Sequence, residues 1–217
     1  MLRLVALDMD GTLVDVESSW AAIHHHFQDH NADGLREFLA GRIDDHEFIR
    51  TDIRIWWRHA PDLSVEDLER ILAPVPLMPG AHELVDGVHA LGARTVILSG
   101  GIDLLAHRIA RELGIDLVLA NGFRVTSDGR LTGEGIVRVP INGKEKVLEG
   151  LQHQLGIAPR ETASIGNSEI DVGMFRRSRV GVAFLPADDV VRAAAAHVVT
   201  ERNLGRALDA LRDFPDP

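Results

Sequence analysis

The chain has 217 residues, of which 45% are hydrophobic, so it can form one domain with an insertion or two small domains. Its formal net charge of -10 at pH 7 argues against nucleic acid as the main partner, because binding to a phosphate backbone needs a basic surface. The absence of cysteine excludes disulfides and thiolate metal sites.

The N-terminus leads directly into an apolar strand, so we expect no signal peptide. No apolar run approaches the roughly 20 residues that a membrane-spanning helix needs, and we expect no membrane partner. The simplest location is the cytoplasm. Composition leaves open whether the protein is a monomer or a homodimer.

The rest of the sequence is organised around its first 14 residues. Leu2 and residues 4–7 form an apolar run, typical of a strand that is buried on both faces of a parallel sheet. Asp8 and Asp10 follow at the carboxyl end of this strand, where open α/β sheets bind ligands. Two neighbouring carboxylates repel each other unless a cation compensates their charge. Mg²⁺ is such a cation, because it prefers carboxylate and carbonyl oxygens. The alternative is an ordinary surface turn.

Residues 15–77 have a different, helical character and predict a small cap inserted after the first strand. Ser64 and Asp67 stand at the spacing of a helix capping box. The proline-rich residues 73–80 end this region, because proline stops a helix and stiffens the connection. We therefore expect a core domain of residues 1–14 and 78–217 and a cap domain of residues 15–77.

From residue 79 the pattern alternates between helices and strands, which predicts a parallel sheet with right-handed crossovers. Asp128 and Gly129 mark the turn of a small β-hairpin. The predicted fold class is α/β, a doubly wound, Rossmann-like parallel sheet with an inserted helical cap and the hairpin. Helices are expected at 81–91, 103–113, 144–155, 174–177, 187–196 and 204–212, and strands at 94–98, 116–120, 162–165, 179–184 and 197–199.

Polar clusters follow three of the predicted strands, and such strand ends converge on one crevice. They are Asp8 with Asp10, then residues 99–101 (Ser-Gly-Gly), and residues 166–171. Lys144 at the start of a helix adds a compact positive charge that suits phosphoryl oxygens. Glycines let the backbone approach an anion closely, and carboxylates are known nucleophiles toward phosphorus. Together these features predict a phosphate site.

The ordered set of motifs resembles the haloacid dehalogenase (HAD) superfamily of phosphohydrolases. The matching segments are Asp8-Met-Asp-Gly-Thr, Ser99-Gly-Gly, Lys144 and Gly166-Asn-Ser-Glu-Ile-Asp171, and they cover nearly the whole chain in order. Within the superfamily the chain most resembles the phosphoserine phosphatases. The resemblance implies a phosphomonoester hydrolase that acts on a small phosphorylated metabolite, with L-phosphoserine as the expected substrate.

The resemblance also implies roles for the two acids and the metal. Asp8 is expected to attack phosphorus and become a phosphoaspartate, while Asp10 protonates the leaving alcohol and later activates water. Mg²⁺ is expected to bind the Asp8 carboxylate, the Asp10 main-chain carbonyl and the side chain at 167. The superfamily usually has Asp where this chain has Asn167, which removes one negative charge from the ion's ligands.

Other residues are expected to hold the phosphoryl group. Ser99, Gly100 and Gly101 should contact its oxygens, and Lys144 should stabilise the transition-state charge. Lys146 is a weaker alternative to Lys144 for this role. Asp171 is expected to orient the metal water or the lysine.

In the phosphoserine phosphatases a cap glutamate binds the substrate amino group and a cap arginine binds its carboxylate. Glu17 and Arg50 stand where these residues are expected, although each has the alternative of a solvated surface charge. Three other functions stay open at this point: a phosphotransferase to an alcohol such as homoserine, a phosphatase of another small ester, and a weakened regulatory or binding protein, which Asn167 suggests.

Overall fold

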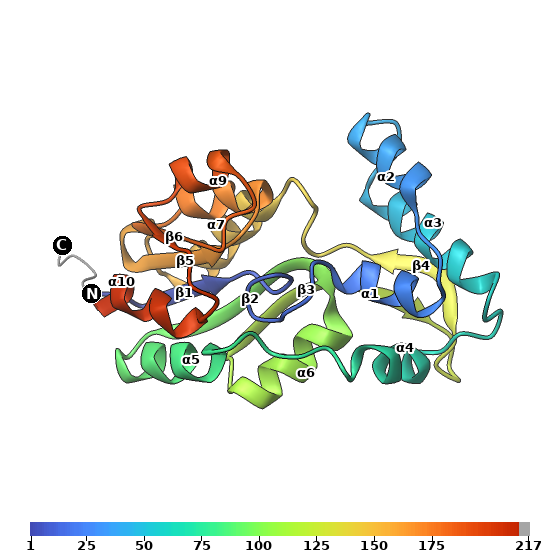
Figure 1. Ribbon diagram of the computed structural model, residues 1–217, viewed down its shortest axis with the longest axis horizontal. Coiled ribbons are helices and arrows are strands. Elements are labelled where there is room, and N and C mark those ends of the chain that lie inside the picture. Colours follow the sequence, from blue (N-terminus) through green and yellow to red (C-terminus); the bar gives the residue numbers. More distant parts are fainter. Residues whose placement is uncertain (213–217) are drawn as a thin grey trace.

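The structure is a computed structural model that describes residues 1–212. A seven-stranded sheet crosses it in the order β4-β3-β2-β1-β5-β6-β7 (Figure 1). Every neighbouring pair is parallel except β3 and β4, which form the predicted hairpin at one edge. The strands are β1 (Leu4–Leu7), β2 (Arg94–Ile102), β3 (Leu117–Val125), β4 (Leu131–Ile136), β5 (Thr162–Gly166), β6 (Val180–Phe184) and β7 (His197–Val199).

Strand β1 lies at the centre of the sheet, between β2 and β5. Its side chains alternate between two hydrophobic clusters, with Val5 and Leu7 in one and Leu4 and Ala6 in the other. All four are fully buried, which confirms the prediction of a strand covered on both faces. Asp8 follows immediately, so the sheet fixes the position of this carboxylate from both sides.

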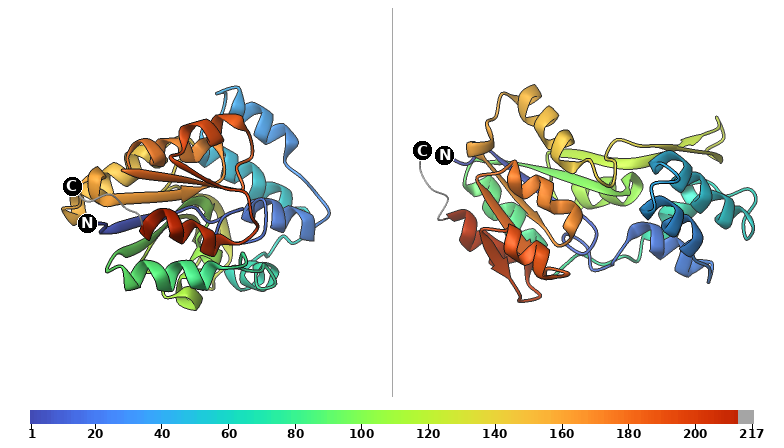
Figure 2. Two further views of the ribbon diagram at one scale, coloured as in Figure 1. Left: turned by 60° about the vertical axis from the view of Figure 1, so that its left-hand side comes forward. Right: turned by 90° about the horizontal axis from the view of Figure 1, so that it is seen from above.

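Helices cover both faces of the sheet, which confirms the doubly wound fold class. In Figure 1 the helices α5, α6 and α10 lie below the sheet and α7 and α9 above it, and Figure 2 gives two further views. The predicted helix at 204–212 begins with a 3₁₀ turn, η3. The bounds are α5 (Ala81–Ala90), α6 (Asp103–Leu113), α7 (Lys144–Leu155), α8 (Val172–Arg176), α9 (Asp189–Ala194) and α10 (Ala207–Arg212), with η1 (Pro159–Glu161), η2 (Glu169–Asp171) and η3 (Leu204–Arg206).

Four helices lie between β1 and α5 in the sequence and form a second lobe beside the hairpin (Figure 1). Helix α3 packs on β4, and the buried Trp56 of α3 stacks on Trp20 and meets Phe123 edge to face. The predicted capping box of Ser64 and Asp67 is present. These helices are α1 (Ser19–His26), α2 (Ala32–Leu39), α3 (Asp45–Trp57) and α4 (Val65–Leu72).

Strand β2 is longer than predicted, since it continues past Leu98 to Ile102. Its pairing with β3 shifts register between Leu98 and Ile102, around the two glycines that follow Ser99. The predicted Ser-Gly-Gly turn is therefore an irregular extension of the strand, and it carries the chain toward the helical lobe. In residues 1–212, no helix has the length and apolar character needed to cross a membrane.

Candidate active site

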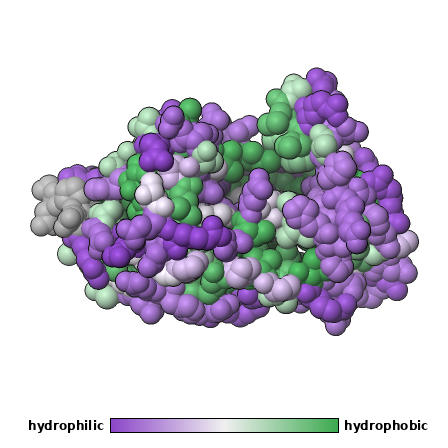
Figure 3. Space-filling view, viewed as in Figure 1, coloured by the Kyte–Doolittle hydropathy of each residue, from purple (hydrophilic) through white to green (hydrophobic). Residues whose placement is uncertain are grey.

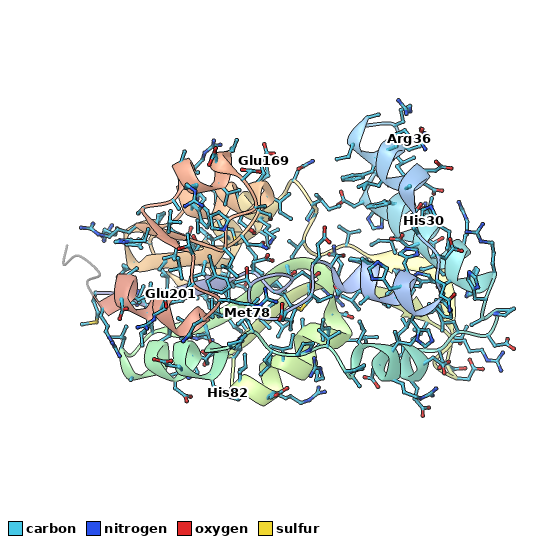
Figure 4. The ribbon with its side chains drawn as sticks, viewed as in Figure 1. His30, Arg36, Met78, His82, Glu169 and Glu201 are labelled. Atoms are coloured by element: carbon cyan, nitrogen blue, oxygen red, sulfur yellow. The ribbon has the colours of Figure 1, made fainter. Side chains whose placement is uncertain are left out.

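A cavity of about 730 Å³ lies at the carboxyl ends of β1, β2 and β5, between the sheet and the helical lobe. Figure 3 shows a hollow with apolar surface between the two lobes. In Figure 4, His30 on the helical lobe and Glu169 on the core lobe lie on its two sides. Seven predicted site residues line this cavity: Asp8, Asp10, Glu17, Ser99, Gly100, Gly101 and Asn167.

Lys144 is the buried cation beside this cavity. It is the first residue of α7, is 1% exposed, and its ammonium group lies 2.6 Å from Oδ1 of both Asp8 and Asp171. Burial opposes the charge on Lys144, but the carboxylates of Asp171 and Asp8 outweigh it and hold its pKa above the ordinary value. The structure therefore places the Lys144 ammonium group in contact with both Asp171 and the predicted nucleophile, Asp8.

The remaining oxygen of Asp171 fixes the loop after β5. Its Oδ2 accepts hydrogen bonds from the main-chain amides of Asn167 and Ser168 at 3.0 Å each, and from Ser168 Oγ at 2.9 Å. One buried carboxylate therefore holds Lys144 with one oxygen and positions Asn167 with the other.

Burial raises the pKa values of both acids at the end of β1. The pKa of Asp8 rises to about 7, because burial and the charge of Asp171 outweigh the opposing effect of Lys144. The pKa of Asp10 rises to about 6, because burial outweighs two hydrogen bonds from Ser19. Such shifts are typical of carboxylates that take part in proton transfer or covalent catalysis.

The end of β2 is held by side chains from two other segments. The carbonyl oxygen of Gly100 accepts hydrogen bonds from Trp20 Nε1 at 3.0 Å and from Asn121 Nδ2 at 3.1 Å. Asn121 also accepts from the amides of Arg138 and Val139 at 2.9 Å each. These contacts fix the Ser-Gly-Gly segment against the cavity.

The donor set suits a hard divalent cation. The side-chain amide of Asn167 lies so close to Gly11 that a Cβ there would overlap it, and Gly11 has φ +73°. Asn167 is therefore adjacent to the Asp8–Asp10 turn, as the predicted ligand set requires. Asp8 and Asp171 share one ammonium group, and Asp10 has no cationic hydrogen-bond partner among the described residues. The three acids therefore carry more negative charge than Lys144 can balance, and a cation can neutralise it.

An ion at this position depends on amide and main-chain oxygens as well as carboxylates. In the part of the chain that the structure describes, no group of three or more His, Asp or Glu side chains is arranged to hold a metal. The carbonyl oxygens of Asn167 and of the Asp10 main chain are the remaining ligands of the predicted type.

The two predicted substrate residues of the helical lobe differ in position. Glu17 is exposed at the cavity, and the structure gives its carboxylate no ion pair within residues 1–212. Arg50 does not line the cavity. Its guanidinium binds both carboxylate oxygens of Glu134 on β4, at 2.8–3.0 Å, and Glu47 at 3.1 Å. The structure therefore does not bring Arg50 together with the other predicted site residues.

Sequence reasoning missed three residues that contact the site: Ser19, Trp20 and Asn121. Ser19 donates to Asp10, and the other two hold Gly100. The position of Ser19, nine residues after Asp10 and at the start of a helix, gives no local signal of this contact. Asn121 lies within β3, and only the fold shows its partners.

The model of the haloacid dehalogenase-like hydrolases matches residues 5–176, and the chain belongs to this family. It is 30% identical to a phosphoserine phosphatase of Idiomarina loihiensis over 96% of this chain and 93% of that protein. It is 26% identical to a phosphoserine phosphatase of Methanocaldococcus jannaschii over 97% and 98% of the two chains. The predicted likeness to phosphoserine phosphatases and the predicted class of enzyme, a phosphatase, are confirmed.

The fold also matches solved structures. A substrate-bound phosphoserine phosphatase complex superposes with a TM-score of 0.79 at 23% identity and covers 97% of this chain and 98% of that one. At this identity the match supports the fold, which agrees with the predicted HAD-like architecture.

The raised pKa of Asp8 makes the stability of the metal-free protein depend on pH. Because the pKa rises from 3.8 to about 7 on folding, the folded protein binds this proton more tightly, and stability is lost as pH rises through about 7. Asp8→Asn removes the ionisation. We therefore expect the free energy of unfolding of the variant, relative to that of the wild type, to be higher at pH 8 than at pH 5, measured by urea unfolding with a chelator present. An equal or smaller effect at pH 8 would contradict this assignment.

Proposed function

We propose that this protein is a Mg²⁺-dependent phosphomonoesterase that forms a phosphoaspartate on Asp8, with L-phosphoserine as its substrate. The contact of Asp8 with Lys144 and Asp171, at the wall of a cavity that also contains Asp10, carries the proposal. The names of the relatives support the choice of phosphoserine. Hydrolysis of phosphoserine yields serine, so we propose a cytoplasmic role in serine formation.

In the first step Asp8 attacks phosphorus. Lys144 holds Oδ1 of Asp8 at 2.6 Å, which leaves Oδ2 as the attacking oxygen. The bond from phosphorus to the ester oxygen breaks, and Asp10 gives its proton to the leaving alcohol. Ser99 Oγ and the Gly100 amide hold the phosphoryl oxygens, and Lys144 stabilises the charge that develops on them.

In the second step water hydrolyses the phosphoaspartate. Asp10, now ionised, takes a proton from the attacking water, and phosphate leaves as Asp8 is restored. A carboxyl group with a pKa of about 6 can both give and accept a proton near neutral pH. Asp8, the Asp10 carbonyl and Asn167 would hold Mg²⁺, which would supply charge neutralisation and orient the phosphoryl group.

We propose that the helical lobe, residues 15–77, acts as the cap that recognises the alcohol part of the substrate. Glu17 lies at the cavity with no ion pair among residues 1–212, and its carboxylate suits the amino group of phosphoserine. The cavity volume of about 730 Å³ leaves ample room for a small metabolite.

The position of Arg50 favours a second candidate, a phosphatase of another small ester. Its guanidinium is paired with Glu134 and Glu47, so the substrate carboxylate has no arginine partner in this arrangement. No lysine or arginine side chain lines the cavity in the described chain. An amino-alcohol phosphate without a carboxylate would fit these walls.

Phosphate release tests the proposed reaction. We expect the purified protein to release phosphate from phosphoserine in the presence of Mg²⁺, and we expect this release to stop when a chelator is added. Asp8→Asn should lower turnover by at least about 1,000-fold, because it removes the attacking oxygen. The variant should unfold cooperatively, as a control for its fold. If the folded wild-type protein releases no phosphate from a panel of phosphoamino acids, sugar phosphates and nucleotides, the proposal is wrong.

A comparison of two substrates separates the two candidates. If Arg50 reaches the substrate carboxylate during catalysis, phosphoserine should exceed phosphoethanolamine in kcat/KM by about 10-fold or more, since charge-assisted hydrogen bonds contribute about 1.5–3 kcal/mol. Arg50→Gln should then remove this preference, and we expect both results for the phosphoserine phosphatase. If kcat/KM is equal for phosphoserine and phosphoethanolamine, and remains equal in Arg50→Gln, the result would support the second candidate instead.

Asn167→Asp tests whether the amide weakens the metal site. The substitution restores one negative charge among the ligands, and ligand charge tunes the affinity of such sites over several powers of ten. We expect Mg²⁺ to bind about 10-fold or more tightly, measured by calorimetry with the metal alone and by its half-saturating concentration in the phosphatase assay. Unchanged affinity and turnover would mean that Asn167 is an adequate ligand, and the regulatory alternative would lose its support.

A further inference from the structure

The two carboxylate oxygens of Asp10 have different surroundings. Oδ2 accepts two hydrogen bonds from Ser19, one from its main-chain amide at 2.9 Å and one from Oγ at 2.8 Å. Oδ1 is buried and has no hydrogen-bond partner in the described structure, although Asp10 lines the cavity. Ser19 therefore leaves Oδ1 as the oxygen available to a reacting molecule.

The hydroxyl of Ser19 is itself fixed by the sheet. Its Oγ accepts a hydrogen bond from the amide of Ile102 at 3.0 Å while it donates to Asp10, and the residue is fully buried. Because the Ile102 amide is a donor, the single hydroxyl proton of Ser19 is directed to Asp10. The orientation of this hydroxyl follows from the end of β2.

Two neighbouring contacts keep the arrangement rigid. Trp20, the next residue of α1, donates from Nε1 to the Gly100 carbonyl at 3.0 Å, so the first turn of α1 is attached to β2 twice. A Cβ on Gly101 would lie 2.7 Å from both Asp10 Oδ2 and Ser19 Oγ. Only glycine at this position lets the strand approach the pair so closely.

We propose that Ser19 is the positioning residue for proton transfer by Asp10. By occupying Oδ2, it keeps the transferable proton on Oδ1, the oxygen that has no hydrogen-bond partner in the described structure. When the bond from phosphorus to the ester oxygen breaks, that proton moves from Oδ1 to the leaving alkoxide, and Oδ1 later receives a proton from the attacking water. The inference rests on the proposed function, and Ser19 acts through Asp10 without touching the substrate.

Ser19→Ala combined with two leaving groups tests this role. Serine leaves from phosphoserine as a strongly basic alkoxide that needs a proton, whereas 4-nitrophenolate leaves from 4-nitrophenyl phosphate without one. The value of kcat/KM covers the steps up to phosphoaspartate formation. We expect Ser19→Ala to lower kcat/KM for phosphoserine by about 10- to 100-fold, within the range of general acid catalysis. For 4-nitrophenyl phosphate the change should stay within about 3-fold.

Ser18→Ala is the matched control. Ser18 caps the same helix by accepting a hydrogen bond from the Ala21 amide, whereas within residues 1–212 the hydrogen bonds to the Asp10 carboxylate come from Ser19. If Ser18→Ala weakens α1, it should therefore lower kcat/KM by the same factor for phosphoserine and for 4-nitrophenyl phosphate. Ser19→Thr, which keeps the hydroxyl, should restore the preference of the wild-type protein.

The outcomes distinguish this inference from the proposed function. An inactive wild-type protein would count against the phosphatase itself. If the wild type is active and Ser19→Ala lowers kcat/KM equally for both substrates, or for neither, the role of Ser19 is overturned and the phosphatase proposal stands. Should Ser19→Ala fail to fold, Ser19→Cys, which replaces the hydroxyl with a weaker donor, should show the same substrate-dependent loss to a smaller degree.

Discussion

The buried contact of Lys144 with Asp8 and Asp171 is the interaction on which the site depends. Removing one partner of a buried ion pair typically costs about 3–5 kcal/mol, because the remaining charge has no water to solvate it. Here three elements share the contact: the end of β1, the start of α7 and the turn η2. The charge that positions the catalytic groups therefore also holds these elements together.

The same contact explains why the site suits a phosphate ester. Burial raises the pKa values of Asp8 and Asp10, and the charge of Asp171 adds to the shift at Asp8. A nearby cation would therefore stabilise the ionised form of both acids. A dianionic phosphoryl group can enter such a pocket only together with a cation. The sequence difference at Asn167 bears on this balance, because an amide oxygen contributes to coordination without adding charge.

The sequence predicted the core and most of the site because their signals are local. The strand before Asp8 and the glycines after Ser99 can be identified from neighbouring residues alone. The partners of Arg50 and Ser19 cannot, because Glu134 lies 84 residues away on the hairpin and Asp10 meets Ser19 only after α1 folds back onto the sheet. Strand β2 was underestimated because its irregular end has no regular pattern of side chains.

The ion pair between Arg50 and Glu134 has a consequence for how a substrate reaches the pocket. It ties α3 to β4, and β4 is continuous with the main sheet, while Ser19 and Trp20 attach α1 to β2. Two of the walls around the entrance are therefore fastened to the core. Helix α2 packs on α3 and exposes Leu35 and Leu39. Ala32 and Leu35 of this short helix line the cavity, so its sequence can change the wall of the pocket without changing the residues that carry the chemistry.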